Sequence, residues 1–591
     1  MQKLVDLIKK AFSLLEVKDK RKVLLMIPIS VFLGLIDLVG VALLGTVGTL
    51  AFRLISNDPK PTRLESIFQS IIPGNISLNS LTLLLAIASI LVLGSKTILQ
   101  ALVNFKYLKF LAKLESDLAL QLFKRIIRAR ASDLNNNKYS DYQYSLTIGA
   151  NRVVTGIFQT TISFMSDSIT TVLMGAFAFY ASPTAFGLTL FIFGLTYYLI
   201  NGPIHRRSTK YGNQSMKVYI SLSEGLLENF RGIKDVHVYK QEERLIKTFS
   251  REKWEQSLLA QKMFWLSSIS RYFFEFAILI AGVAIITVLS ITTDLRHTVT
   301  AVVIFMSVGF RLIPNIQRIQ SSMVSLRIAE GATASFFNYL DDFHEETPRW
   351  INSSGSQIEE KLEFIELDKV TFSYSGSESI LKDITFKLQS NKTLAVIGES
   401  GSGKTTLADI IAGINRPTEG FVRFTESNAM SNGAKYIPSI GYVSQNSSLF
   451  GNDIYENIAF GKNPDSPDKR KIDQILERFN LSFLSDSEFG SARGSIRSDG
   501  TNLSGGERQR ISIARVEYAD PQIVIFDEPT SSLDADNRSK VTDYIKSINH
   551  KKTVVIVTHD LDLVELCDYV LEITNGRVKF FGATSEFNPR N

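Results

Sequence analysis

The chain has 591 residues, a net charge of +6 and a single cysteine, and 45% of its residues are hydrophobic. This length predicts two or three domains. One cysteine excludes intrachain disulfides and a cysteine-based zinc cluster, and so small a net charge gives no support to nucleic-acid binding.

The first 22 residues are polar and basic, and they lack the apolar core of a cleavable signal peptide. Apolar side chains recur among the lysines at helical spacing between residues 1 and 18. Residues 1–22 therefore predict an amphipathic helix that lies on a membrane surface, although a soluble capping helix would have the same pattern.

Six apolar stretches follow, and each reaches the roughly 20 residues that a helix needs to cross a bilayer. They lie near residues 23–55, 81–105, 152–181, 184–204, 264–292 and 298–325, within a membrane part that we place at 23–341. Basic residues crowd before the first stretch and after the second, whereas the links around Pro183 and Arg296 have almost none. By the positive-inside rule, both ends of the chain are expected in the cytoplasm.

The segments between these stretches also carry information. Residues 106–132 and 206–262 are polar but helix-forming, which predicts that the spanning helices continue well into the cytoplasm. Turns are expected near residues 135–144 and 229–240. Apolar residues at helical spacing between positions 64 and 72 predict a short amphipathic helix on the external side.

Charged side chains lie inside the apolar stretches, at a cost of roughly 2.5–3.5 kcal/mol each on insertion scales. Such residues require a partner or a water-filled cavity. Arg271 and Glu275 lie four residues apart on one helix face, so an ion pair and a substrate-binding role are both open. Lys96, Arg311 and Arg318 have no acidic neighbour in the sequence, which favours a cavity that accepts an anion.

A polar linker at residues 342–360 precedes a segment, 361–591, with mixed strand and helix patterns. Within it, Gly398 to Thr405 read Gly-Glu-Ser-Gly-Ser-Gly-Lys-Thr between an apolar strand-like run and a helical run. Glycines in such a loop let backbone N–H groups turn toward phosphate. Lys404 is expected to reach the β- and γ-phosphates, and Thr405 to bind Mg2+. The expected phosphate-binding residues are Gly398, Glu399, Ser400, Gly401, Ser402, Gly403, Lys404, Thr405 and Thr406.

Two further strand-like runs are followed by residues that ATP hydrolysis requires. The run at 523–526 leads into Asp527 and Glu528, and the run at 553–557 is followed by His559. Asp527 is expected to hold Mg2+ through water, and Glu528 to polarise the attacking water as general base. His559 is well placed to contact the γ-phosphate at the carboxyl end of its strand.

A second phosphate-binding segment comes before the helical run at 507–514. It reads Leu-Ser-Gly-Gly-Glu, and its expected binding residues are Ser504, Gly505, Gly506 and Glu507. Small residues at a helix start again suit an anion. One ATP does not need two such segments in one domain, so the second is explained if it serves the ATP of a facing copy.

These motifs, in this order, resemble those of ABC transporters over nearly the whole chain. The corresponding parts are the aromatic loop (Tyr374), the Walker A loop (398–405), the glutamine loop (Gln445), the signature (503–507), the Walker B residues (Asp527, Glu528), the D-loop (531–534) and the switch histidine (His559). The resemblance implies that Tyr374 stacks on adenine and that Asp534 belongs to the nucleotide site. It also implies that Gln445 contributes to Mg2+ binding and catalysis.

Six spans followed by one nucleotide domain resemble the half-transporter exporter type. The resemblance implies a multidomain α and α/β fold, a homodimer, and ATP with Mg2+ as cofactors. The sequence departs from the family pattern in two places, at Glu507 and at residues 497–500. Glu507 stands where glutamine is commoner, and residues 497–500 read Arg-Ser-Asp-Gly instead of Gly-Glu-Arg-Gly, which puts the usual cross-subunit coupling contact in doubt.

Within exporters, residues 270–275, 310–314, Lys96 and Arg318 are similar to bacterial lipid-linked oligosaccharide flippases. That similarity implies an amphipathic substrate with an anionic pyrophosphate head, in the bacterial cytoplasmic membrane. Two alternatives are open. One is an exporter of a peptide or another lipid, and the other is an ATP-gated channel or regulatory protein, against which Glu528 argues.

Overall fold

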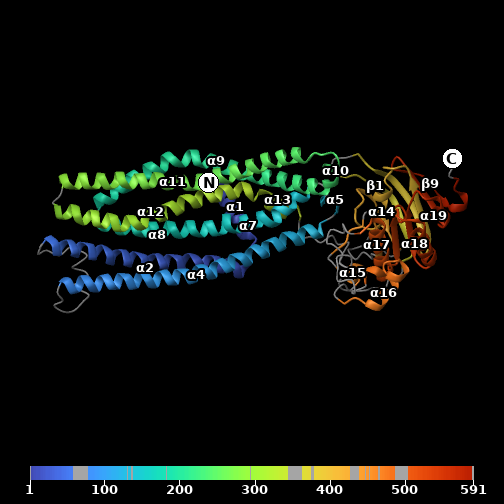
Figure 1. The fold of residues 1–591 in the computed structure, drawn as a ribbon, viewed down its shortest axis with the longest axis horizontal. Coiled ribbons are helices and arrows are strands. Elements are labelled where there is room, and N and C mark those ends of the chain that lie inside the picture. Colours follow the sequence, from blue (N-terminus) through green and yellow to red (C-terminus); the bar gives the residue numbers. More distant parts are fainter. Residues whose placement is uncertain are drawn as a thin grey trace. The chain divides into compact units, whose positions relative to one another are not determined.

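The computed structural model describes most of the chain, and Figure 1 follows it from the first helix to the last strands. The described residues are 2–56, 78–129, 131–134, 138–181, 183–292, 295–343, 362–374, 378–425, 438–445, 447–450, 453–462, 466–485 and 503–588. Three predictions lie outside them: the external helix near 64–72, most of the linker at 342–360, and the departure at 497–500. Two compact units make up the chain. One contains Met1–Ile127 and Asn137–His344, and the other contains Arg128–Asn136 and Glu345–Asn591.

The first unit is built from helices. Its α-helices are α1 (Gln2–Ser13), α2 (Val17–Ser56), α4 (Leu78–Arg128), α6 (Tyr139–Tyr144), α7 (Ala150–Arg152), α8 (Thr160–Ala181), α9 (Pro183–Arg231), α10 (Ile233–Val238), α11 (Glu242–Thr292), α12 (Leu295–Ala332) and α13 (Ala334–Asp342). Two π-helical segments, η1 (Ser145–Gly149) and η2 (Val153–Gln159), flank α7. The short helix α5 (Ala131–Leu134) belongs to the second unit.

Five of the described helical segments are long and apolar enough to cross a membrane. They are Val17–Gly48, Asn79–Arg128, Tyr139–Tyr180, Pro183–Arg231 and Glu242–Ile291. Helix α12 contains the sixth expected span and is not among these five. Helices α4 and α9 continue without a break from an apolar stretch into a polar one, and α11 from a polar stretch into an apolar one, so the polar segments are helical as expected. Their cytoplasmic location stays a prediction.

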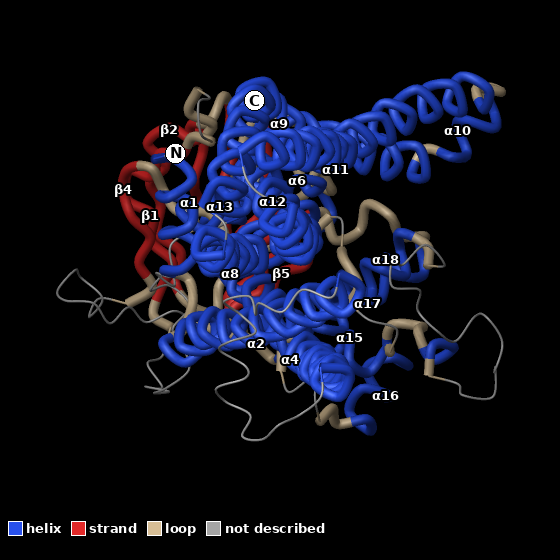
Figure 2. Tube along the Cα trace, turned by 90° about the vertical axis from the view of Figure 1, so that its left-hand side faces the viewer, coloured by secondary structure: helices blue, strands red, loops and turns tan. Residues whose placement is uncertain are grey.

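Helices α9 and α11 form a hairpin with α10 at its tip, and Figure 2 shows this tip well away from α8. Helix α12 packs against α8, α9 and α11. Where α9 crosses α12, a Cβ on Gly212 would lie 2.3 Å from the carbonyl oxygen of Ile328. A Cβ on Gly331 would lie 2.6 Å from the backbone nitrogen of Asn213. Glycine at both positions therefore lets the two backbones touch.

The amphipathic segment predicted at 1–22 forms α1, but its last residues already belong to α2. Leu4 and Ala11 of α1 are buried. The Phe12 ring packs edge-on against Phe158 of η2, with ring centroids 5.3 Å apart. The apolar face of α1 is thus covered in part by protein, while Val5 stays exposed.

The second unit contains two sheets and the helices around them. Its elements are β1 (Phe364–Phe372), β2 (Leu381–Gln389), β3 (Thr393–Gly398), α14 (Lys404–Ile411), β4 (Glu419–Arg423), β5 (Ile440–Val443), α15 (Ile454–Ala459), α16 (Lys469–Arg478), η4 (Ser482–Leu484), α17 (Gly505–Ala519), β6 (Ile523–Asp527), α18 (Ala535–Ile548), β7 (Thr553–Val557), α19 (Leu561–Glu565), β8 (Tyr569–Thr574), β9 (Arg577–Ala583) and η5 (Thr584–Glu586). The predicted helix and α/β parts of the fold class are therefore confirmed.

The larger sheet has the strand order β5-β6-β7-β3-β8-β9. The first five strands of this order, β5, β6, β7, β3 and β8, pair in parallel. Strand β9 pairs antiparallel with β8 at one edge. Strands β6 and β7 are buried along their whole length, as expected for apolar runs in a parallel sheet with both faces covered. The smaller antiparallel sheet has the order β2-β1-β4.

The only cysteine of the chain, Cys567, lies just after α19 in the core beside the larger sheet. It is 5% exposed, and its thiol donates to the carbonyl oxygen of Leu563 at 3.3 Å. Burial raises the pKa of the Cys567 thiol to about 12. The thiol is therefore fully protonated at neutral pH.

Candidate functional site

The predicted ATPase residues gather at one edge of the larger sheet. Gln445 follows β5, Asp527 ends β6 and is followed by Glu528, His559 follows β7, and the phosphate loop follows β3. These four parallel strands are consecutive in the sheet. Since carboxyl ends of parallel strands meet at one edge, residues far apart in the sequence come together in the crevice where such folds bind ligands.

Three glycines of the phosphate loop adopt backbone conformations that other residues rarely reach. The angle φ is 148° at Gly398, 81° at Gly401 and 101° at Gly403. A Cβ on Gly398 would also lie 2.2 Å from the carbonyl oxygen of Ile573 in β8. The turn itself therefore requires glycine, and it leads straight into the N-terminal end of α14, an arrangement that suits phosphate.

Lys404 folds back over the phosphate loop. It is 7% exposed, and its Nζ donates to the carbonyl oxygens of Gly398 at 2.9 Å and Glu399 at 2.8 Å. Burial lowers the pKa of Lys404, and the nearby carboxylates of Glu528 and Asp527 act in the opposite direction. A phosphate group in the loop would offer this ammonium stronger, charged acceptors than the two carbonyls.

The loop and the end of β6 carry the residues that we expect to bind ATP and Mg2+. Ser402 Oγ is buried and has no hydrogen-bond partner among the described residues, as expected of a donor reserved for a phosphate oxygen. The Thr405 hydroxyl hydrogen-bonds to Asp527, and burial raises the pKa of Asp527. Within the described ranges, no group of three or more His, Cys, Asp or Glu residues could hold a metal. Mg2+ in nucleotide sites binds through one or two protein ligands plus the phosphates, and the expected roles of Thr405 and Asp527 toward it stay predictions.

Glu528 lies at the centre of the three predicted catalytic residues. Its Oε2 accepts a hydrogen bond from Gln445 Nε2 at 3.0 Å, and its Oε1 lies 3.5 Å from His559 Nε2. Its backbone φ is 52°. The backbone N–H of Glu528 donates to the carbonyl oxygen of Val557, and its own carbonyl oxygen accepts from Gln509 Nε2. A left-handed conformation at a residue other than glycine is costly and concentrates at functional sites. The structure thus brings together the three side chains that the sequence predicted as catalytic, whose roles stay predictions.

The second phosphate-binding segment forms a capped helix start. Ser504 Oγ accepts from the N–H of Glu507 at 3.2 Å, and Glu507 Oε2 accepts from the N–H of Ser504 at 2.7 Å. Glu507 therefore completes a capping box. A Cβ on Gly506 would lie 2.8 Å from the carbonyl oxygen of Ser532, so the D-loop packs directly on this segment. Asp534 acts as N-cap of α18, and the predicted nucleotide contacts of these residues stay predictions.

Tyr374 packs as a core residue in this structure. Its ring lies edge-on to Phe372, with centroids 4.9 Å apart and an interplanar angle of 85°. It is partly buried against the core formed by the smaller sheet and one face of the larger sheet. Its predicted stacking on adenine stays a prediction.

Tyr442 and Asp409 join the site although no motif singled them out. The Tyr442 hydroxyl donates to Asp409 Oδ1 at 3.1 Å, and it also hydrogen-bonds to Asp527. Burial raises the pKa of Asp409, an effect that the bond from Tyr442 opposes. In the sequence, Tyr442 is an ordinary strand residue three positions before Gln445. Only the parallel pairing of β5 with β6 brings it beside Asp527.

We expect Tyr442→Phe to raise the Mg2+ concentration that half-saturates Mg2+-dependent ATP binding by about 10-fold or more, because outer hydrogen-bond partners of metal ligands typically contribute 10–100-fold. A titration with Mg2+ at fixed fluorescent ATP analogue measures this midpoint. Tyr455→Phe is the control, since that hydroxyl bonds to Asp473 at 2.8 Å away from the site. An unchanged midpoint in Tyr442→Phe would contradict the role of this hydroxyl.

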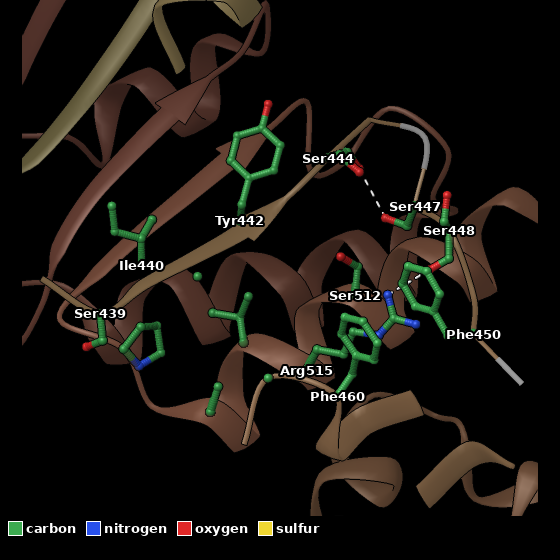
Figure 3. Close-up of a pocket in the computed structure, with 15 residues that line it drawn as sticks. Ser439, Ile440, Tyr442, Ser444, Ser447, Ser448, Phe450, Phe460, Ser512 and Arg515 are labelled. Carbon is green, nitrogen blue, oxygen red and sulfur yellow. Dashed lines mark hydrogen bonds between the residues drawn. The ribbon is translucent and has the colours of Figure 1, made fainter. Parts of the chain in front are cut away.

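A hollow of about 430 Å³ lies beside the glutamine segment (Figure 3). Phe450 and Phe460 stack within it, with ring centroids 4.3 Å apart, and the guanidinium of Arg515 lies 5.5 and 5.8 Å from the two rings. Burial lowers the pKa of Arg515 to about 10, so the side chain remains charged at neutral pH. Ser444, which precedes Gln445, also lines the hollow. The hollow therefore borders the segment that carries the glutamine.

Two of the cations predicted for a substrate cavity are paired with carboxylates within the membrane part. Lys96 Nζ lies 2.7 Å from Asp37 Oδ2, and both side chains are nearly buried. Arg271 Nε donates to Glu275 Oε1 at 2.6 Å on an exposed helix face. The ion pair that the spacing of Arg271 and Glu275 allowed is thus present. The sequence showed no acidic neighbour for Lys96. In the structure its acidic partner, Asp37, comes from another helix, α2.

Arg318 is also paired across helices. Its Nε and Nη2 donate to the carboxylate of Asp167 in α8 at 3.0 to 3.1 Å, and Nη2 donates to Asn315 as well. The Arg318 side chain nevertheless remains 54% exposed. The side chain of Arg311 lies outside the described residues, so the structure leaves its predicted role open.

Two family models match the chain. The ABC transporter model matches residues 381–531, and the ABC transporter transmembrane region model matches residues 25–313. The fold is similar to a solved bacterial Atm1-family ABC exporter with ATP bound, with a TM-score of 0.74 at 18% sequence identity, over 93% of this chain and 95% of that chain. The two family models together match most of the chain, which thus belongs to the ABC transporters as an exporter-type half-transporter, with a transmembrane domain fused to an ABC ATPase domain. Hydrolysis of ATP in the second domain is coupled to transport.

Named relatives place the chain among exporters and flippases. The ATP-dependent lipid A-core flippase of Burkholderia pseudomallei (strain 1710b) is 25% identical over 475 residues, which are 80% of this chain and 78% of the relative. The lactococcin-G-processing and transport ATP-binding protein LagD of Lactococcus lactis subsp. lactis is 25% identical over 490 residues, 81% of this chain and 67% of the relative. The first name gives lipid A-core as the cargo, and the second gives lactococcin G.

Proposed function

We propose that two copies of this chain form an ATP-driven flippase for a lipid-linked oligosaccharide or polysaccharide precursor. The substrate has an anionic pyrophosphate head, and the flippase acts in the bacterial cytoplasmic membrane. The proposal narrows the exporter class in three respects, which are the assembly, the catalytic roles and the cargo. Each has its own support in the described residues.

The assembly follows from the two phosphate-binding segments. Half-transporters of this class typically act as dimers. Each chain carries one phosphate loop at 398–405 and one capped helix start at Ser504, and a single ATP does not need both. In the proposed homodimer, each ATP lies between the loop of one subunit and Ser504 of the other. Closure of the two ATPase domains on ATP then turns the membrane cavity outward.

The catalytic roles follow from the sheet edge. Thr405, and Asp527 through water, would hold Mg2+, with Gln445 as a further ligand, and Glu528 would act as the general base toward the attacking water. His559 contacts the γ-phosphate. Because ATP is a cytoplasmic nucleotide, the ATPase domain lies in the cytoplasm, in agreement with the basic residues that flank the first two apolar stretches.

One observation supports the proposal that the cargo is anionic. The Arg318 side chain is about half exposed, although its Nε and Nη2 donate to the carboxylate of Asp167. Its Nη1 donates to none of the described residues. An arginine in an apolar helix with an exposed free donor suits a phosphate oxygen. The lipid named in the Burkholderia relative supports a lipid-linked cargo, at 25% identity.

The test compares substrates and matched variants in proteoliposomes. A polyprenyl-pyrophosphate-linked saccharide should stimulate ATP hydrolysis, whereas a neutral glycolipid should not. Asp167→Asn frees the guanidinium and should keep the stimulation. Asp167→Asn combined with Arg318→Gln removes the guanidinium without leaving an unpaired acid. It should weaken the apparent affinity for the pyrophosphate-linked saccharide about 10-fold or more, since a hydrogen bond to a charged group contributes about 1.5–3 kcal/mol.

Two results would overturn the proposal of a pyrophosphate-linked cargo. One is an unchanged response in the double variant, and the other is stimulation by a peptide but by no pyrophosphate-linked lipid. The second result would favour the alternative of an exported peptide, which the similarity to LagD keeps open. ATP-dependent ion currents that do not need hydrolysis would instead favour a channel.

A further inference from the structure

A second cavity, of about 260 Å³, lies in the first unit beside the ends of the apolar stretches. Its walls come from α6, η1, α7, α9, α11 and α12. The lining residues of α9 and α12 come after the predicted span ends at 204 and 325, and those of α11 come before the span start at 264. The cavity thus belongs to the polar helical extensions.

The lining of this cavity is basic. Arg152 of α7 and Lys253 of α11 contribute two cations, and none of the described lining residues is acidic. Lys253 Nζ donates at 2.7 Å to Gln256 Oε1, which is a neutral partner. Ser215 and Ser257 add hydroxyl groups, and Tyr219 lies against the buried ring of Tyr144 with centroids 5.4 Å apart. Two cations and several neutral hydrogen-bonding groups around one hollow suit an anion.

The local backbone explains why Arg152 is available. The π-helical segments η1 and η2 lie on either side of α7, so Arg152 ends a short α-helical stretch between two irregular ones. Segments of this kind recur at functional sites. A Cβ on Gly156 would lie 2.7 Å from Ala329 Cβ, and one on Gly149 would lie 3.3 Å from Phe336 Cβ. The segment is therefore packed closely against α12 and α13 while it also borders the cavity.

We propose that this cavity binds the phosphate-bearing head of the transported molecule before it reaches the membrane spans. The proposal rests on the proposed function, since it names a receiving site for that anionic cargo. Typical pockets for drug-sized ligands measure about 300–1,000 Å³, so a cavity of 260 Å³ suits a head group rather than a whole lipid. A free diphosphate carries the same chemistry.

The test measures binding of two probes to the full-length protein in nanodiscs, with the ATPase sites saturated by Mg-ADP so that the phosphate loops cannot bind the probes. The probes are inorganic pyrophosphate and farnesyl diphosphate. Arg152→Gln with Lys253→Gln should weaken binding about 10-fold or more, on the scale of a lost charged hydrogen bond. Lys247→Gln with Arg251→Gln removes two cations from α11 outside the cavity lining and should leave binding unchanged.

Arg152→Lys with Lys253→Arg keeps both charges and should retain binding, which separates loss of charge from loss of folding. Weakened binding of farnesyl diphosphate alone identifies a lipid head as the ligand, and weakened binding of both probes identifies the diphosphate itself. Equal affinity in wild type and in the Arg152→Gln, Lys253→Gln variant overturns the site. The proposed function fails by another readout, the absence of ATPase stimulation by any pyrophosphate-linked lipid.

Discussion

Glu528→Gln should abolish steady-state ATP hydrolysis and leave ATP binding intact. The carboxylate lies between Gln445 and His559 at the edge of the parallel sheet, where a bound water would need a base. General-base catalysis typically contributes 10²–10⁴-fold, so we expect the turnover rate to fall by about that factor. Phosphate release measures turnover, and equilibrium binding of a fluorescent ATP analogue measures binding.

The control for this substitution is Glu572→Gln. Glu572 lies on β8 of the same sheet, in register with Ile397 just before the phosphate loop, and its side chain bonds to Lys579 at 3.1 Å rather than to a predicted catalytic residue. The control should hydrolyse ATP at the wild-type rate. Retained turnover in Glu528→Gln would remove Glu528 from the catalytic role, whereas loss of ATP binding would point to damaged folding.

Breaking the pair of Lys96 and Asp37 should destabilise the membrane domain strongly. The two groups are 2.7 Å apart, and their side chains are 9% and 13% exposed. Removing one partner of a buried pair leaves an uncompensated charge and typically costs about 3–5 kcal/mol. Asp37→Asn and Lys96→Met should each show this loss in denaturant unfolding in detergent, and the combined variant should recover most of it.

The same variants decide between pairing and substrate binding for Lys96. If Lys96 is structural, the combined variant regains stimulation by the pyrophosphate-linked lipid together with its stability. If Lys96 binds the head group, stability returns but stimulation does not. Arg271→Gln with Glu275→Gln is the control for the stability measurement. Because an exposed pair contributes about 0–1 kcal/mol, this variant should unfold at nearly the wild-type denaturant concentration.

The ATPase half of the molecule was predictable from sequence because its chemistry requires local patterns. Positive φ angles at Gly398, Gly401 and Gly403 favour glycine strongly, so the loop can be recognised in the sequence from the spacing of its glycines. Strands such as β6 and β7 are buried on both faces and therefore appear as short apolar runs. Their order in the sheet then places the residues that follow them at one edge.

The ion pairs between different helices and the cavities were not predictable, because their partners meet only in three dimensions. Asp167 lies 151 residues before Arg318, and no spacing rule joins a charge on one spanning helix to a charge on another. Tyr442 has no signal beyond a strand-like position. The cavity at Arg152 and Lys253 lies beside two π-helical segments, whose hydrogen bonds span five residues instead of the four of an α-helix and which leave no clear pattern in the sequence.

The buried cysteine makes the natural chain a convenient background for site-specific labelling. Thiolate is the form that reacts with maleimides, and a thiol with a pKa of about 12 that is 5% exposed should stay unlabelled. Cysteines introduced at exposed positions, such as Tyr239 near the tip of the α9–α11 hairpin, would therefore carry spin labels or fluorophores without prior removal of Cys567. Distances between two such labels in a dimer could then be followed through one cycle of ATP hydrolysis in the otherwise unmodified transporter.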